Sequence, residues 1–329
     1  MVRVGIIGAP GLLAKELNNA LEERKFPTLS PRLLTMDAVE PALLGIVAFG
    51  DEAAVIEPFS ADMLAEFDVL FLSGSAADAR RVAELARVAH PCPLLVDLAG
   101  ALDHEPGARL AGFEAEPGDG GGARLLVVAH PAAQMLALLL ERLERCGRIE
   151  VAAATVFEPA SQRGMAGIQE LEQQTVKLLA LQALPQAVFD GQVAFNLRMS
   201  LGEGAVPSLA SVRERILADT RTLCGQAAGR LALQVLQPPL FHGSVVSLFV
   251  GWVSAPPAAA VQTALESPWL RRVESPDVVS VAGEDTVQVS GPRMDAGHGM
   301  WLYAGTDNLR RIAFSAVDAA AAALARRPA

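Results

Sequence analysis

The start of the chain constrains the fold most strongly, because an apolar strand leads directly into a glycine turn and a helix. Residues 2–7 are mostly apolar, and the segment Gly8-Ala9-Pro10-Gly11-Leu12-Leu13-Ala14 follows them. Gly8 permits a tight turn, Gly11 lets the backbone approach a pyrophosphate, and Ala14 allows close packing of the helix on the strand. The helix N-terminus then offers free N–H groups and its positive dipole end to phosphates. The alternative is a purely structural turn.

Strand and helix patterns alternate through the first 129 residues. Apolar runs predict strands at residues 32–36, 68–72, 94–97 and 125–129, with helices at residues 12–23 and 76–89. This alternation predicts a parallel, doubly wound sheet whose dinucleotide-binding end is the glycine turn. Residues 114–122 are rich in glycine and acidic side chains, which predicts a surface loop.

The pattern changes near residue 149. Longer strands are predicted at residues 149–157, 231–236 and 245–253, with helices at residues 165–183 and 209–223 between them. This arrangement is typical of an α+β domain with a mixed or antiparallel sheet. The last segment, residues 308–325, has periodic apolar positions that predict a packed helix.

Composition excludes several classes of partner. The net charge of −10 argues against nucleic acid, because phosphate binding needs clustered Lys and Arg. No apolar run reaches the roughly 20 residues that span a bilayer, so we expect no membrane partner. The N-terminal residues enter a strand without the features of a signal peptide, so we expect a cytoplasmic protein. Cys92, Cys146 and Cys224 lack metal-ligand spacing, which favours reduced structural thiols and no metal site.

The end of the second predicted strand bears on cofactor choice. The strand ends in Thr35-Met36-Asp37-Ala38. The Asp37 carboxylate would repel the 2′-phosphate of NADP, and it can accept a hydrogen bond from a free ribose 2′-OH. If a dinucleotide binds, we therefore expect NAD rather than NADP. The alternatives are a solvent-facing Asp37 and a chain that binds no cofactor.

The chain resembles the aspartate-semialdehyde dehydrogenase family in separate motifs that occur in family order. The motifs are Gly5-Ile6-Ile7-Gly8-Ala9-Pro10-Gly11, Leu21-Glu22-Glu23-Arg24-Lys25-Phe26-Pro27, Val128-Ala129-His130-Pro131-Ala132-Ala133-Gln134-Met135, Gly164-Met165-Ala166-Gly167-Ile168-Gln169-Glu170-Leu171, Ala194-Phe195-Asn196 and Thr306-Asp307-Asn308-Leu309-Arg310. The resemblance covers nearly the whole chain and implies an α/β architecture. Residues 1–128 with 307–329 would form a Rossmann-like NAD(P)-binding domain, and residues 129–306 an α+β dimerisation and substrate domain.

The same resemblance implies a homodimer formed through residues 129–306. Together with the glycine turn, it implies contacts to a cofactor from nine residues. These are Gly8, Pro10, Gly11, Leu12, Leu13, Asp37, Ser73, Gly74 and Asn308.

The catalytic positions that the resemblance implies carry other residues in this sequence. The catalytic Cys aligns with Ala133, the catalytic Gln with Glu158, the acid–base His with Ser244, the carboxylate-binding Arg with Gln237, the phosphate-binding Arg with Asp103, and a substrate-binding Glu and Lys with Asp219 and Thr222. A methyl group cannot form a thiohemiacetal or be acylated, and a serine hydroxyl does not titrate near neutral pH as histidine does. Gln carries no charge for a carboxylate, and Asp103 would repel phosphate. We therefore predict that the parent activity is absent.

These losses resemble the non-catalytic paralogues of the family, the Usg proteins, and leave three interpretations. The first is a protein that keeps the fold, the dimer and, as one alternative, dinucleotide binding. The second is an oxidoreductase or acid–base enzyme with a rebuilt site at His130, Glu158 and His242, although His130 can equally cap a helix. The third is a regulatory subunit that pairs with an unidentified protein.

Overall fold

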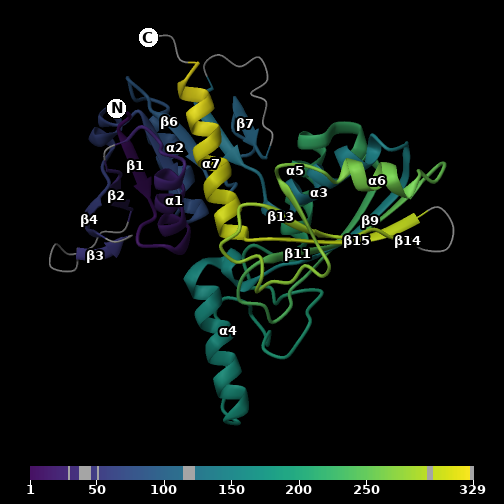
Figure 1. Cartoon of the computed structure of the whole chain (residues 1–329). Helices are drawn as coiled ribbons and strands as arrows, with labels where there is room; N and C mark the ends of the chain where they lie inside the picture. Colours follow the sequence, from purple (N-terminus) through teal and green to yellow (C-terminus); the bar gives the residue numbers. More distant parts are fainter. Residues whose placement is uncertain (29, 37–45, 50–51, 114–122, 295–298, 327–329) are drawn as a thin grey trace. The chain divides into compact units, whose positions relative to one another are not determined.

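The computed structural model describes residues 1–28, 30–36, 46–49, 52–113, 123–294 and 299–326. The predicted ribose contact, Asp37, and the predicted loop at residues 114–122 lie outside these ranges. Contacts divide the chain into two compact units (Figure 1). Unit 1 comprises Met1–Ala129 and Ile312–Ala329, and unit 2 comprises His130–Arg311. The binding roles that the sequence assigns to these two parts stay predictions.

Unit 1 is built on an eight-stranded sheet with the order β3-β4-β2-β1-β5-β6-β8-β7. The strands are β1 (Val4–Ile7), β2 (Arg32–Thr35), β3 (Ile46–Phe49), β4 (Glu52–Pro58), β5 (Val69–Leu72), β6 (Leu94–Asp97), β7 (Ala108–Ala111) and β8 (Leu125–Val128). Every pairing is parallel except that of β3 with β4. The predicted doubly wound, Rossmann-like sheet is confirmed, and β3, β4 and β7 add to it.

Helices cover both faces of this sheet. They are α1 (Leu12–Glu23), α2 (Ala76–Ala86), α7 (Asn308–Leu324) and the 3-10 helix η1 (Ala61–Glu66). Alternate residues of each strand point to opposite faces. Ile6 and Phe71 therefore join the core under α1 and α7, whereas Ile7 and Leu72 join the core under α2 and η1. Burial on both faces explains why these strands read as continuous apolar runs.

Unit 2 is built on a mixed sheet with the order β10-β9-β11-β15-β13-β12, and β14 pairs with β15. The strands are β9 (Ile149–Phe157), β10 (Leu231–Leu236), β11 (Ser244–Trp252), β12 (Leu270–Val273), β13 (Val287–Ser290), β14 (Arg293–Met294) and β15 (Gly299–Thr306). The central pairs, β9 with β11 and β11 with β15, are antiparallel. The predicted α+β fold with a mixed sheet is confirmed.

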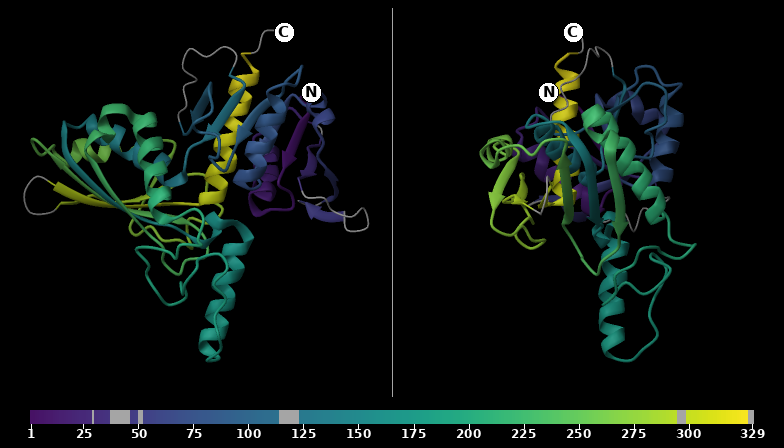
Figure 2. Two further views of the ribbon diagram at one scale, coloured as in Figure 1. Left: turned by 180° about the vertical axis from the view of Figure 1, so that it is seen from behind. Right: turned by 90° about the vertical axis from the view of Figure 1, so that its right-hand side faces the viewer.

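The helices of unit 2 differ in how they meet this sheet. They are α3 (Pro131–Glu144), α4 (Gly164–Leu179), α5 (Leu209–Cys224), α6 (Ala258–Ala264) and the 3-10 helices η2 (Ala160–Arg163) and η3 (Gly225–Arg230). Figure 2 shows α3, α5 and α6 together on one side of the sheet, while α4 projects from one end of it. Within the described residues, no helix combines the length and apolarity needed to cross a bilayer.

Several helix ends differ from the prediction for local reasons. The helices expected at residues 76–89 and 165–183 end at Ala86 and Leu179. Pro91 follows the first, and a residue that precedes proline avoids helical torsion angles. Beyond the second, Leu181 has a φ of +55°, a left-handed conformation that ends a right-handed helix.

Candidate functional site

The predicted phosphate-binding turn of unit 1 places two glycines in direct contact. Gly8 has a φ of +110°, and a Cβ atom added there would lie 2.3 Å from the backbone N of Gly74. The Gly8 N–H donates to the carbonyl of Leu34 over 3.0 Å, and the Gly11 N–H donates to the carbonyl of Gly8 over 3.0 Å. The turn after β1 therefore touches the turn after β5. A side chain on Gly8 would disrupt this contact.

The start of α1 remains uncapped. Gly11 occupies the N-cap position, and no side chain hydrogen-bonds to the first turn of the helix. By contrast, α2 begins with Ser75, whose hydroxyl accepts from the N–H of Asp78. The first-turn N–H groups of α1, at Leu12 and Leu13, thus have the arrangement that anions bind. The predicted contacts of a pyrophosphate with Gly8, Gly11, Ser73 and Gly74 stay predictions, and the uncapped start of α1 is compatible with them.

At the start of α3, a buried methyl group occupies the expected nucleophile position. His130 is the N-cap residue, and its Nδ1 accepts from the N–H of Ala132 over 3.2 Å. Pro131 follows at the first helical position, where its missing N–H costs nothing. Ala133 is fully buried, with 0% of its surface exposed. The first turn is therefore closed by a side-chain cap and by close packing.

His130 joins a buried polar cluster, which we call the His130 cluster. Its Nε2 lies 3.2 Å from Oε1 of Glu158 and 3.2 Å from Nε2 of Gln162. Its backbone N–H donates to Oδ2 of Asp219 over 2.8 Å, and Arg215 Nε lies 3.6 Å from the same oxygen. Because Nδ1 accepts the cap hydrogen bond, Nε2 is the ring nitrogen that faces Glu158 and Gln162.

Two further equivalents of catalytic residues are buried beside Glu158. Gln237 Nε2 donates to the carbonyl oxygens of Glu158 and Pro238 over 2.8 and 3.0 Å. Ser244 begins β11 and pairs with Thr306 of β15. Asp103, the residue at the expected phosphate-binding position, belongs to unit 1 and is exposed.

His242 belongs to a second cluster, which also contains Ser161, Asp307 and Asn308. His242 Nδ1 lies 3.2 Å from the hydroxyl of Ser161, and its Nε2 lies 3.0 Å from Oδ1 of Asp307. Asn308 Nδ2 donates to the Ser161 hydroxyl over 3.0 Å, and its Oδ1 accepts from the N–H of Gly243 over 2.9 Å. His242 makes no hydrogen bond with His130 or Glu158 within the described structure. The predicted three-residue site is thus divided between two clusters.

Asp307 anchors the second cluster as a charged group. Its carboxylate accepts from the N–H groups of Gly283 and Arg310 over 2.9 and 3.0 Å. Burial raises the pKa of Asp307, but the hydrogen bond and charge of His242 and these two backbone donors outweigh it and lower the pKa overall. Asp307 therefore stays ionised and caps the start of α7.

The second cluster has the order of a Ser–His–Asp relay but not its accessibility. A catalytic serine needs an exposed hydroxyl that can reach a substrate carbonyl. Only 1% of the Ser161 surface is exposed, and the Asn308 amide also holds its hydroxyl. The relay consequently orders the end of β15 and the start of α7.

Two of the three cysteines have raised pKa values. Cys92, Cys146 and Cys224 are all free thiols. Burial raises the pKa of Cys146. Burial and the charge of Glu141 raise the pKa of Cys224 to about 11, although the backbone N–H of Ala228 opposes this. A thiol with a raised pKa forms little of the reactive thiolate at neutral pH.

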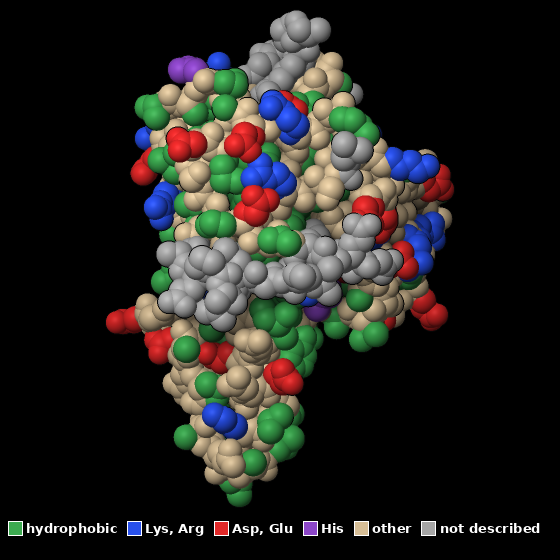
Figure 3. Space-filling view, turned by 90° about the vertical axis from the view of Figure 1, so that its left-hand side faces the viewer, with side chains coloured by type: hydrophobic (Ala, Val, Ile, Leu, Met, Phe, Trp, Pro, Cys, Tyr) green, Lys and Arg blue, Asp and Glu red, His purple; other side chains and the backbone are tan. Residues whose placement is uncertain are grey.

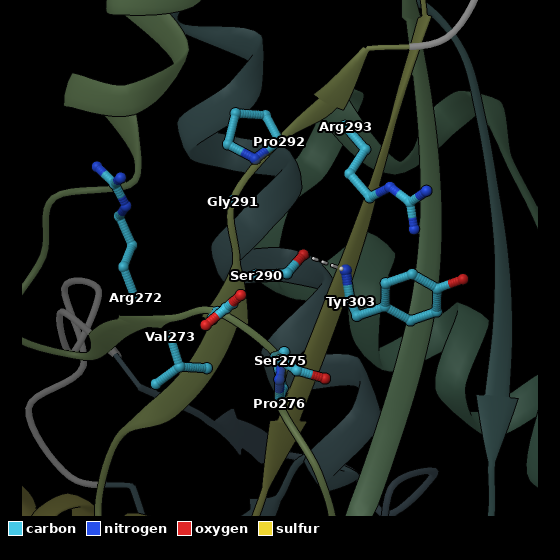
Figure 4. A pocket seen from close by; sticks show the side chains of 10 residues that line it. Arg272, Val273, Ser275, Pro276, Ser290, Gly291, Pro292, Arg293 and Tyr303 are labelled. Carbon is cyan, nitrogen blue, oxygen red and sulfur yellow. Dashed lines mark hydrogen bonds between the residues drawn. The ribbon is translucent and has the colours of Figure 1, made fainter.

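A surface cavity of about 780 Å³ in unit 2 contains none of the predicted site residues. Figure 4 shows Arg293 beside the ring of Tyr303, whereas Arg272 extends from the opposite wall and points elsewhere. The Ser290 hydroxyl accepts from the N–H of Tyr303 over 3.0 Å. The two arginines therefore do not form a shared anion clamp. In the described ranges, no three His, Cys, Asp or Glu side chains gather as metal ligands.

Sequence reasoning missed Ser161 and Gln162 as members of the two clusters. Their partners are remote in the sequence: Ser161 and Asn308 are separated by 147 residues, and Gln162 and His130 by 32 residues. A serine or glutamine without a motif carries no spacing signal.

Comparisons with known proteins identify the family. No protein-family model matches the chain. A USG-1 protein homologue of Azotobacter vinelandii is 30% identical over 323 residues, which cover 94% of each protein. An aspartate-semialdehyde dehydrogenase of Streptomyces akiyoshiensis is 24% identical over 330 residues, with 94% coverage of each. The solved structure of a probable aspartate-semialdehyde dehydrogenase from Pseudomonas aeruginosa has a TM-score of 0.83, 25% identity and 98% coverage of both chains. The chain therefore belongs to the aspartate-semialdehyde dehydrogenase family, in the group of the USG-1 protein homologues.

Proposed function

We propose that this protein does not oxidise aspartate semialdehyde in a phosphate-dependent reaction, and that it keeps a dinucleotide-binding turn. The observation that carries the first part is the buried methyl group of Ala133 at the start of α3. The reaction needs a thiolate that attacks the aldehyde carbon and later leaves from a thioester. A methyl group has no electron pair for either step, and the raised pKa values of Cys146 and Cys224 make these thiols poor substitutes.

The remaining replacements support the same proposal. Gln237 uses its amide N–H groups on the carbonyls of Glu158 and Pro238, so it offers no charge and no spare donor to a carboxylate. Ser244 is fully buried and has no group that exchanges a proton near neutral pH. Restoring one residue would therefore not restore the reaction.

Dinucleotide binding is supported by the geometry after β1. The turns that contain Gly8 and Gly74 pack backbone against backbone, which a Cβ atom on Gly8 would prevent, and the uncapped N-terminus of α1 presents its N–H groups. Gly8, Pro10, Gly11, Leu12, Leu13, Ser73 and Gly74 would hold the pyrophosphate and adjoining groups, and a bound dinucleotide would supply a hydride donor or acceptor. The choice of NAD over NADP rests on the sequence position of Asp37. Asn308 is less suited to a cofactor contact, because Ser161 and Gly243 occupy its amide.

We also propose a homodimer formed through unit 2. Alternate residues on one face of the mixed sheet are partly exposed although they are large and apolar, among them Val151, Phe249, Trp301 and Tyr303. Phe249 and Trp301 pair across β11 and β15, with ring centroids 5.2 Å apart. Such a face favours a protein contact.

The segment around α4 adds further exposed apolar groups. Figure 3 shows hydrophobic side chains along this projecting part of the surface. The exposed large apolar residues between 164 and 208 include Val176, Leu179, Leu181, Phe195, Leu197 and Met199. Light scattering should give twice the chain mass, and Trp301→Glu should give monomers while Val88→Glu, at an exposed position of unit 1, should not. A monomeric wild type would overturn the homodimer and leave this face to a different protein partner.

A second candidate function is acid–base chemistry at His130 and Glu158. The supporting observation is their buried 3.2 Å contact, which resembles the pairing of a general base with an orienting carboxylate. His242 does not take part, because it contacts Ser161 and Asp307. If His130 and Glu158 carry out acid–base chemistry, His130→Ala should abolish turnover of the protein's substrate. Ala133→Ser should leave that turnover intact. Equal turnover in both variants would exclude it.

The decisive assay combines both parts of the main proposal. Purified protein is mixed with aspartate semialdehyde, phosphate and either NAD⁺ or NADP⁺, and reduced nicotinamide is followed by absorbance. We expect no rate above a heat-inactivated control. Calorimetry on the same sample should show NADH binding in the micromolar range, about −8 kcal/mol, and weaker binding of NADPH.

A further inference from the structure

A carboxylate lies beside the glycine turn of unit 1 to which we assign pyrophosphate binding. Gly74 has no side chain, and two groups lie close to the position that its Cβ atom would occupy. Asp78 Oδ2 is 3.2 Å from this position, and the Cα atom of Gly8 is also 3.2 Å from it. The Asp78 carboxylate is therefore within about 7 Å of Gly8, less than the Debye length of about 8 Å at physiological ionic strength.

The start of α2 holds this carboxylate in place. Asp78 Oδ2 accepts from the N–H of Ser75 over 3.1 Å and from the Ser75 hydroxyl over 2.6 Å. The Ser75 hydroxyl in turn accepts from the N–H of Asp78 over 3.1 Å. These reciprocal hydrogen bonds form a capping box. The side chain of Asp78 consequently turns back toward Gly74.

The capping box needs an acceptor at position 78, but it does not need a charge. Both hydrogen bonds from Ser75 end on the same oxygen, Oδ2, and a neutral amide oxygen could accept them in the same way. No Lys or Arg in the described part of the chain, including the exposed Lys15 of α1, forms an ion pair with Asp78. The negative charge at this position is therefore not cancelled by a neighbouring side chain.

This charge discriminates between phosphate groups. A pyrophosphate that is esterified at both ends, as in a dinucleotide, carries one negative charge per phosphate. A terminal phosphate monoester has a second pKa near 6, so it carries almost one further charge at pH 7. The N–H groups at the start of α1 attract both kinds of group. Repulsion by the Asp78 carboxylate grows with each added charge.

We propose that Asp78 is a specificity residue that favours ligands with a doubly esterified pyrophosphate over nucleotides with a terminal phosphate. NADH and ADP-ribose belong to the first class, and ADP and ATP belong to the second. The inference rests on the proposed dinucleotide binding and deepens it by naming the kind of phosphate group that the turn admits. It is separate from the expectation for Asp37, because all four ligands carry a free ribose 2′-OH.

The test compares ADP-ribose with ADP by calorimetry on the full-length protein. Both ligands contain adenosine and a pyrophosphate, and they differ in whether the second phosphate is esterified. Asp78→Asn keeps an acceptor for the capping box and removes the charge. We expect this variant to bind ADP more tightly than the wild type does. The ratio of ADP-ribose affinity to ADP affinity should fall by about threefold to tenfold.

Two control variants separate the charge from the cap and from the helix. Ser75→Ala loses the hydroxyl of the capping box but keeps the carboxylate, so it should keep the wild-type affinity ratio. Glu84→Gln removes a carboxylate from an exposed position of α2, and it should also keep that ratio.

A measurement on the wild type replaces Asp78→Asn if that variant does not fold. The ratio of ADP-ribose affinity to ADP affinity is followed as sodium chloride is raised from about 20 mM to about 500 mM, which shortens the Debye length from about 20 Å to about 4 Å. The ratio should fall, because salt screens the repulsion of the additional phosphate charge. A ratio that stays constant or rises would contradict the role of Asp78.

The outcomes separate this inference from the function on which it rests. An unchanged affinity ratio in Asp78→Asn, with ligand binding intact, would overturn the role of Asp78 and leave dinucleotide binding standing. An equal fall of the ratio in Glu84→Gln would show a general effect of protein charge and would also overturn that role. If neither the wild type nor Asp78→Asn binds NADH, ADP-ribose or ADP, dinucleotide binding itself is wrong and the inference falls with it.

Discussion

Two strand-to-helix junctions of this protein, the turn from β1 into α1 and the start of α3, have opposite local chemistry. At α1 the N-cap is Gly11, and no side chain caps the first turn of the helix. At α3 the N-cap is His130, whose ring accepts from the first turn while Ala133 is fully buried. The first junction keeps free N–H groups of the kind that bind anions, and the second uses its N–H donors within the protein. Binding through backbone groups at the first junction is thus compatible with replaced side chains at the second.

The largest effect should come from closing the first junction. In Gly8→Ala the new Cβ atom would lie 2.3 Å from Gly74 N and the residue would keep a φ of +110°. We expect unfolding free energy to fall by roughly 3–5 kcal/mol and NADH binding to be lost. Gly107→Ala has a similar φ of +81° but nothing within 4 Å of the new atom, so it should cost about 1–2 kcal/mol. Urea unfolding measures the unfolding free energy of both variants. Equal losses of unfolding free energy would show that contact with Gly74 is unimportant.

The next effect should come from opening the second junction. His130→Ala removes the cap on Ala132 and the contact with Glu158, so we expect a loss of about 2–4 kcal/mol in unfolding free energy. His104→Ala, at an exposed position, should change it by less than about 0.5 kcal/mol. Chemical denaturation measures the unfolding free energy of the two variants. A His130→Ala protein as stable as the wild type would mean that the cap contributes nothing.

A smaller effect should appear as a pH dependence. The folded pKa of Asp307 is lowered, so its contribution to stability is complete above the unfolded pKa near 3.9 and is lost as pH falls through the folded value. Asp307→Asn should therefore flatten the loss of stability below about pH 4, by about 1 kcal/mol. Asp62→Asn, on exposed η1, is the control. If the unfolding free energies of wild type and Asp307→Asn change in parallel with pH, the lowered pKa assigned to Asp307 is contradicted.

The smallest effect on activity should follow from restoring the nucleophile. Ala133→Cys places a thiol at the start of α3 but leaves Glu158, Gln237 and Ser244 unchanged. We expect no phosphate-dependent turnover and a stability change below about 1.5 kcal/mol, since one sulfur atom is added to a packed site. Single-turnover mixing with aspartate semialdehyde and NAD⁺ checks this. Measurable reduced nicotinamide would mean that the base and anion sites have substitutes elsewhere.

Much of the fold was predictable where hydrophobic periodicity is clear. The bounds of α1, β6, β9 and β10 agree with the predictions, because glycine or charged residues delimit each apolar run. Helix α3 is different: nearly every residue from Pro131 to Leu140 is buried, so no amphipathic period marks it. The strands β12 to β15 are short or lie among glycine and proline residues, and they gave no separate signal.

The candidate site was predictable by residue but not by partner. The motif alignment identified His130, Glu158 and His242, yet the sequence contains no information on which of them meet. The structure pairs His130 with Glu158 and His242 with Asp307. His130 stands at the start of α3 and His242 precedes β11, so the packing of elements remote in the sequence decides which carboxylate each contacts.

The most direct test of the account is the rate of reduced nicotinamide formation from aspartate semialdehyde and phosphate, with folded wild-type protein and each dinucleotide in turn. The account predicts a rate equal to that of the heat-inactivated control with both cofactors. A phosphate-dependent rate above that control would contradict it, because turnover would require a nucleophile other than the methyl group at position 133.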